Sequence, residues 1–154
     1  MVALAILAHE YRCHAVKILN CTAAAFFAFS LMTTIAVGPA LFKNYNTFIT
    51  WSVFAIVTWV TLLIGFPFTL QYARERVPEH IWAMPVFFTT NAIISSIWAG
   101  AFAVLVAADA AAEWLPAVPL WIDIAASVVA FVGAVWFSNW YPDVVRRRSM
   151  AVAR

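Results

Sequence analysis

Charged side chains are scarce in this chain. They make up 10% of its 154 residues, whereas 66% of the residues are hydrophobic. A soluble domain is about half apolar and roughly a quarter charged, and a small fold leaves much of its surface in contact with solvent. The net charge of +2 is also too small to indicate nucleic acid as a partner. The composition therefore excludes an ordinary water-soluble domain and predicts a chain that a lipid bilayer solvates.

Residues for covalent or metal chemistry are also few. The two cysteines, Cys13 and Cys21, are too few for a disulfide framework. In a helix His9 would lie beside Cys13 and Glu10 beside His14, which suits zinc, but only one other histidine is left to complete a tetrahedral site. No histidine lies in an apolar run, which argues against haem, and no nucleophile or phosphate-binding motif is present. We therefore predict no cofactor and no metal, and nothing positive indicates an enzyme.

Four apolar stretches are long enough to cross a bilayer, which takes about 20 residues in a helix. They cover residues 16–42, 47–70, 83–108 and 117–141. Proline and glycine mark their limits, because both interrupt helices. The sequence thus predicts one membrane domain over residues 1–154, with the all-α fold of a four-transmembrane-helix bundle. Pro142 is expected to end the last helix.

The basic residues gather on one side of this predicted domain. Eight of the nine lie there, namely Arg12, Lys17, Arg74, Arg76, Arg146, Arg147, Arg148 and Arg154. The loops on the other side hold only Lys43, together with Asp109 and Glu113. Lysine and arginine in short loops stay in the cytoplasm. We therefore predict that both termini are inside, with a cytoplasmic basic tail at residues 142–154.

Small residues at fourfold spacing indicate where helices pack closely in lipid. The third span carries Ala92, Ser96 and Gly100, and the fourth carries Ala126, Ala130 and Ala134. The connection between these spans is short, which makes them antiparallel neighbours. The two stripes are therefore predicted to face each other.

Asp123 is the first candidate for a functional side chain, because an ionisable residue inside a span is a functional hypothesis by default. It lies less than two turns into the fourth span, on the small-residue stripe. Lys43 ends the first span on the same side, so its long side chain could reach this carboxylate as an interfacial anchor. The other interpretation is structural, with water, hydroxyl groups or the helix start satisfying Asp123.

A second polar face lies in the third span, where Asn91 and Ser95 are four residues apart. Packing between helices is the main interpretation, with a substrate site as the alternative. The loop at residues 71–82 carries mixed charges that can pair locally, for example Glu75 with a neighbouring arginine. This loop is interpreted as an interfacial connector, with a head-group or partner site as the alternative.

Residues 65–78, followed by Trp82, Pro85, Phe87 and Asn91, resemble small bacterial integral membrane proteins of no assigned function. The resemblance covers about a fifth of the chain. It implies the bacterial inner membrane and supplies no activity. Small multidrug resistance transporters also have four helices, but they rely on a glutamate in the first helix, which this chain lacks.

These features predict a multi-pass inner-membrane protein with a structural or accessory role. Its predicted partners are the lipid bilayer and either further copies of itself, as a homo-oligomer, or a larger membrane complex. The rival hypothesis is a small-solute or ion transporter, or a channel subunit, that acts as an oligomer. Such a protein would be built around Asp123 and the hydroxyl groups of the third span.

Overall fold

The computed structural model describes residues 17–38, 46–115 and 117–152, which are helical and contain no strand. The long helices are α2 (Ile18–Val37), α4 (Asn46–Leu63), α7 (Pro85–Trp114) and α8 (Leu120–Val152), and the short ones are α5 (Thr69–Arg74) and α6 (Glu79–Trp82). Each of the four long helices is long and apolar enough to cross a membrane, which confirms the four predicted spans. The chain therefore has the helices of a multi-pass membrane protein.

Several of the predicted limits were wrong. The first span was predicted to reach residue 42, but α2 ends at Val37, and the third was predicted to end at residue 108, but α7 continues to Trp114. The second span was predicted to reach residue 70, but α4 ends at Leu63, because Gly65 takes a φ of 74° and Pro67 has no backbone N–H to donate. The last span was predicted to end at Pro142, but α8 continues through it to Val152. Beyond the proline, an ion pair of 3.3 Å between Asp143 and Arg146 supports this extension of the helix.

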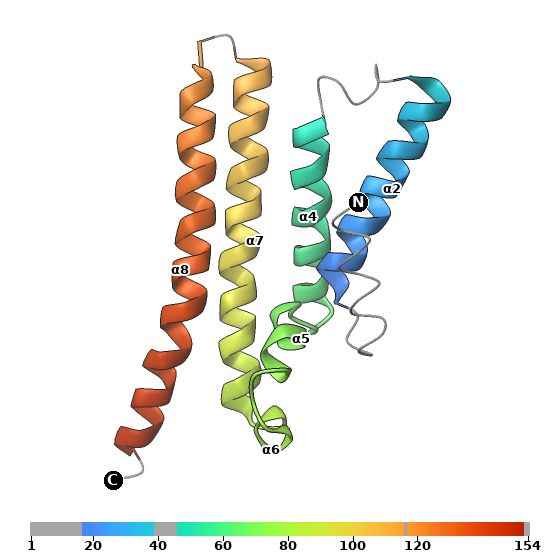
Figure 1. Cartoon of the computed structure of the whole chain (residues 1–154). Coiled ribbons are helices and arrows are strands. Elements are labelled where there is room, and N and C mark those ends of the chain that lie inside the picture. The colour runs from blue at the N-terminus through green and yellow to red at the C-terminus, as the bar shows by residue number, and fades with distance from the viewer. Residues whose placement is uncertain (1–16, 39–45, 116, 153–154) are drawn as a thin grey trace.

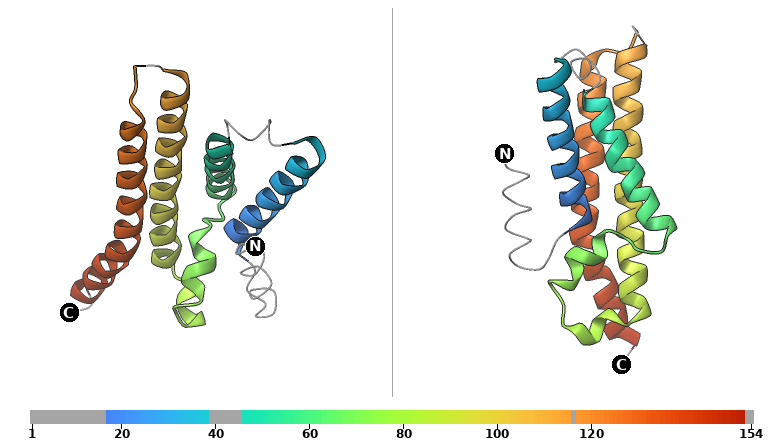
Figure 2. Two further views of the ribbon diagram at one scale, coloured as in Figure 1. Left: turned by 45° about the horizontal axis from the view of Figure 1, so that its top comes forward. Right: turned by 90° about the vertical axis from the view of Figure 1, so that its right-hand side faces the viewer.

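The four long helices stand side by side in one row, in the order α8, α7, α4 and α2 (Figure 1). Helix α7 packs extensively against α8 on one side and α4 on the other, whereas α2 meets α4 over a small area. Towards its C-terminal end α2 leans away from α4 (Figures 1 and 2). No substantial contact joins α8 to α4 or α2 in the described ranges. The predicted packing of a four-transmembrane-helix bundle is therefore not confirmed, and the helices of the described ranges form an open row.

The centre of this row is α7. In the apolar stretch of α7 that could cross the membrane, 39% of the residues are buried. The same share is 11% in α4 and 6% in both α2 and α8. Phe102 of α7 stacks on Phe54 and Trp51 of α4, with ring centroids 5.7 and 6.2 Å apart. On the other side, Trp98 meets the ring of Phe131 of α8 edge to face at 5.4 Å. Aromatic contacts thus hold both neighbours of α7.

The contact between α7 and α8 does not use the predicted stripe of α7. Ser96 and Gly100 are exposed, and a Cβ atom placed on Gly100 would meet no atom within 4 Å. Trp98 turns towards α8 instead, and its Nε1 donates a hydrogen bond of 2.9 Å to Ser138 Oγ. On α8 the stripe residue Ala134 is buried. The prediction that the two stripes face each other was therefore wrong for Ser96 and Gly100 of α7, which point outward.

Candidate functional site

The charged residues of the described ranges lie towards the two ends of the row. One end, here called the acidic end, is where α7 connects to α8 and where Asp109, Glu113 and Asp123 lie. The opposite end, here called the basic end, contains α5, α6 and the C-terminal part of α8, with arginines at 74, 76 and 146–148. The predicted candidate residues divide between these two regions.

Asp123 lies in the first turn of α8 and is half-buried. The hydroxyl group of Ser127 donates a long hydrogen bond of 3.5 Å to its Oδ1. Asp109 of α7 lies within electrostatic reach of both Asp123 and Glu113, so the carboxylates at this end repel one another. Within the described ranges Asp123 forms no ion pair with a cation. Lys43 lies outside the described residues, so its pairing with Asp123 stays a prediction.

Asn91 and Ser95 meet a residue of α5 rather than a neighbouring span. The two side chains are buried, and Thr69 contributes the third member of what we call the α5–α7 joint. The Thr69 hydroxyl donates to the Asn91 backbone carbonyl at 2.9 Å and lies 2.8 Å from Ser95 Oγ. Because Thr69 has a single hydroxyl proton, Ser95 is the donor to Thr69 in this pair. The Asn91 amide donates to the backbone carbonyl of Phe87 at 2.8 Å.

This joint and Asp123 cannot belong to one compact site. Asp109, the neighbour of Asp123, is separated from Ser95 by about 21 Å along α7, at a rise of about 1.5 Å per residue. The hydroxyl groups of the joint are engaged in holding α5 against α7. The arrangement therefore favours the packing interpretation of Asn91 and Ser95, and it places Asp123 apart at the acidic end.

Sequence reasoning missed the contacts that fasten the start of α2 to α5. Lys17 Nζ lies 2.9 Å from the Glu75 carboxylate and 4.7 Å from the centroid of the Tyr72 ring. The backbone N–H of Ile18 donates to Gln71 Oε1 at 2.8 Å. The predicted local pairing of Glu75 with a neighbouring arginine was therefore wrong. The sequence feature that could have indicated these contacts is the fourfold spacing of Gln71 and Glu75, which puts both side chains on one helical face.

Arg74 is the second feature that sequence reasoning missed. Its guanidinium carbon lies 5.4 Å from the centroid of the Trp82 ring, a cation–π arrangement. The indole Nε1 of Trp82 donates to the backbone carbonyl of Val77 at 3.2 Å, which fixes the ring. Arg74 Nε is buried and has no hydrogen-bond partner among the residues that the structure describes. A cation followed eight residues later by tryptophan was visible in the sequence, but its stacking depends on the turn between α5 and α6.

The described residues contain no group of three or more histidine, cysteine, aspartate or glutamate side chains that could hold a metal ion. The predicted helical pairs of His9 with Cys13 and of Glu10 with His14 lie outside the described residues.

Changing Asp123 to asparagine is expected to alter the unfolding free energy by no more than about 0.5 kcal/mol, as at most surface positions. The amide keeps an oxygen for Ser127, and the change removes one of three charges that repel one another. Thermal unfolding in detergent measures this, with Asp109→Asn as a variant expected to behave alike. A loss above about 2 kcal/mol for Asp123→Asn alone would mean that the carboxylate has a charged partner.

No family model, no curated protein and no solved structure matches this chain. The resemblance to small bacterial membrane proteins therefore stays a prediction. The function has to be inferred from the residues and contacts of the chain itself.

Proposed function

We propose that the chain is a structural or accessory subunit of the bacterial inner membrane that packs side by side with further copies of itself. The observation that supports this most is the open row of helices. Because no substantial contact closes the row, both of its faces are available to lipid or to another protein. Without a catalytic set or a metal cluster among the described residues, lateral packing is the role that the geometry supports best.

One surface of the row is suited to close approach by another helix. We call it the small face of α7, and it consists of five exposed residues: Thr89, Ser96, Gly100, Ala103 and Ala107. Their three-, four- and seven-residue spacing puts them on one side of the helix. In lipid, small residues allow two helix backbones to come close enough for van der Waals and Cα–H contacts. The outward faces of the other helices carry bulky side chains, among them Phe29, Ile35, Ile56, Leu63, Val129 and Trp136.

The proposed orientation places the basic end of the row in the cytoplasm. Arg74, Arg76 and the arginines at 146–148 lie at that end, and the carboxylates of Asp109 and Glu113 lie at the other. The positive-inside rule supports this choice, and anionic lipids of the inner leaflet attract each basic residue by about 1 kcal/mol.

The molar mass of the purified protein in mild detergent tests the proposed self-association. We expect wild-type protein to form a defined oligomer and Gly100→Leu to shift it to the monomer, because leucine prevents close approach at the small face of α7. Gly133→Leu on α8 is the matched control, since Gly133 is also exposed and also has no atom within 4 Å of a built Cβ. A monomeric wild type, or the same oligomer in Gly100→Leu as in wild type, would refute the proposal.

A transporter or channel subunit remains the rival, and no contact in the described residues favours it. Such a protein would need Asp123 to share a route with Asn91 and Ser95. These residues lie at separate levels of α7 and α8, and the Ser95 hydroxyl is engaged with Thr69.

A further inference from the structure

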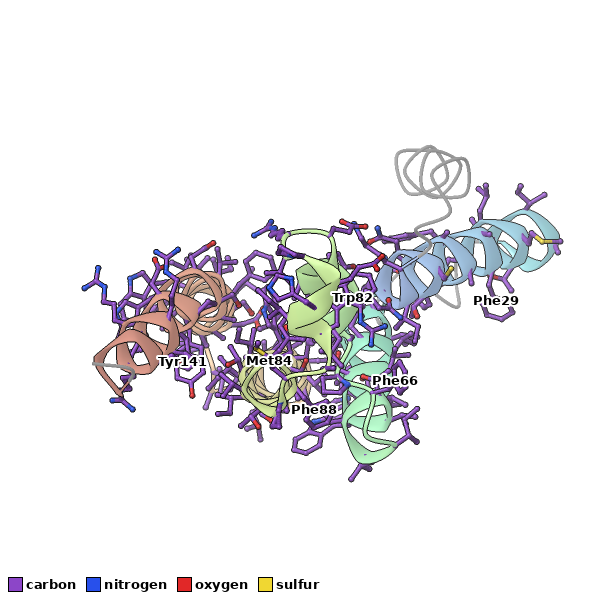
Figure 3. The ribbon with its side chains drawn as sticks, turned by 90° about the horizontal axis from the view of Figure 1, so that it is seen from below. Phe29, Phe66, Trp82, Met84, Phe88 and Tyr141 are labelled. Atoms are coloured by element: carbon purple, nitrogen blue, oxygen red, sulfur yellow. The ribbon has the colours of Figure 1, made fainter. Side chains whose placement is uncertain are left out.

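Arg74 is held in a fixed position where the chain leaves α5 and turns into α6. The Trp82 ring covers it, with 5.4 Å between the guanidinium carbon and the ring centroid. The ring itself is anchored by its hydrogen bond to Val77, and in the view from the basic end Trp82 lies over the α5–α6 segment (Figure 3). The guanidinium group is therefore oriented by the protein before any ligand arrives, unlike that of a freely moving surface arginine.

The described residues supply this guanidinium group with no acceptor. Arg74 Nε is buried and lacks a hydrogen-bond partner, although a guanidinium group carries five donors. The nearest carboxylate in sequence, Glu75, is paired with Lys17 at 2.9 Å. Asp143, another carboxylate at the basic end, is paired with Arg146 at 3.3 Å. A buried Nε is out of reach of an outside ligand, but the terminal nitrogens carry the other four donors and have no acceptor among the described residues. An acceptor from beyond these residues is therefore expected for them.

The depth of Arg74 indicates where that acceptor comes from. Helix α4 has 18 residues, which reach about 27 Å, close to the thickness of the hydrocarbon core of about 30 Å. Helix α5 follows α4 directly and packs beside the lower part of α7 (Figure 1). Arg74, at the end of α5, therefore lies at the level of the lipid head groups. Tryptophan and tyrosine favour the same level, and Tyr72 and Trp82 flank Arg74 in sequence.

We propose that Arg74 binds the phosphate group of an anionic phospholipid at the basic end of the row. Phosphate oxygens accept the parallel hydrogen bonds that a planar guanidinium group donates, and they supply the missing negative charge. The exposed Arg76 adds a second positive charge close by, which favours a lipid with net negative charge over a zwitterionic one. The site does not depend on the self-association proposed above, because Arg74 lies on α5 and the small face lies on α7.

The arginines at 146–148 of α8 provide the contrast that tests this site. They are exposed, and none of them has a cation–π contact with an aromatic ring in the described ranges, so they attract any anionic surface without fixing one phosphate. Removing one of their charges should weaken lipid binding only slightly. Removing the charge of Arg74 should weaken the binding of one anionic lipid about tenfold.

Native mass spectrometry of the full chain in mild detergent measures bound lipids directly. We expect phosphatidylglycerol to bind about tenfold more tightly than phosphatidylcholine with the same acyl chains. Arg74→Gln should lower the affinity for phosphatidylglycerol about tenfold, whereas Arg147→Gln should stay within about twofold of wild type. Soluble glycerol phosphate at the same concentration should not compete, because the site takes the phosphate of an embedded lipid.

Equal binding of the two lipids by wild type would overturn the proposal without any variant, so it stays testable if Arg74→Gln fails to fold. Equal losses in Arg74→Gln and Arg147→Gln would overturn it as well, since they would indicate general charge attraction. Effective competition by glycerol phosphate would show a site for soluble phosphates and would overturn the lipid assignment.

Discussion

Ala99→Leu is expected to lower the free energy of unfolding by about 1–3 kcal/mol. Ala99 is fully buried on α7, with 0% of its surface exposed, in the middle of the row. Three added carbon atoms find no space there, so α7 and its neighbour must separate or adopt strained rotamers. Lipid cannot relieve the clash, because the side chain points into protein.

The matched control is Ala125→Leu on α8, where the alanine is exposed. Its expected change is within about 0.5 kcal/mol, since the added atoms only replace lipid contacts. Denaturant unfolding in detergent, followed by circular dichroism, measures both variants. Equal stability of the two variants would mean that Ala99 does not lie in a protein contact, and the placement of α7 at the centre of the row would be wrong.

Thr69→Val is expected to lower the free energy of unfolding by about 1–3 kcal/mol. Valine keeps the shape of threonine but has no hydroxyl group to form hydrogen bonds with the buried polar groups around it. The Ser95 hydroxyl loses the oxygen 2.8 Å away, and the Asn91 carbonyl loses a donor at 2.9 Å. Ser95 is fully buried, so water does not replace the missing partner. The change should also loosen α5, which hydrogen exchange of the α5 amides would detect as faster exchange.

Thr89→Val is the control for this variant. Thr89 is exposed, and its hydroxyl donates to the backbone of its own helix, at the Pro85 carbonyl. We expect little change in stability and none in the exchange of α5. If Thr69→Val is as harmless as Thr89→Val, the α5–α7 joint does not hold these two helices together.

The four spans could be predicted because length and apolar composition alone determine whether a helix can cross lipid. The open row could not be predicted, because a side chain facing lipid and one facing another helix are equally apolar. The stripe with Ser96 and Gly100 illustrates this: the same small residues suit the α7–α8 contact and an outward face. Trp98 packs in the α7–α8 contact, but nothing in the sequence indicated that its side chain points towards α8 and not towards lipid.

The polar contacts were harder to predict for a different reason. The break at Gly65 and Pro67 takes Thr69 out of the predicted second span and places it against Ser95. In a continuous second span Thr69 would face lipid or a neighbouring helix, so the sequence did not indicate its contact with Ser95. Lys17 and Glu75 are likewise far apart in the chain, and only the position of α5 below α4 brings them together.

Cysteine cross-linking in native membranes tests whether copies of the chain pack through the small face of α7. In a background with Cys13 and Cys21 replaced by serine, Gly100→Cys and Gly133→Cys would be oxidised in separate samples. A disulfide needs Cα atoms within about 7 Å of each other, a distance that only close helix packing provides. We expect a linked dimer for Gly100→Cys and only monomer for Gly133→Cys. Monomer alone in both samples, or equal dimer in both, would contradict it.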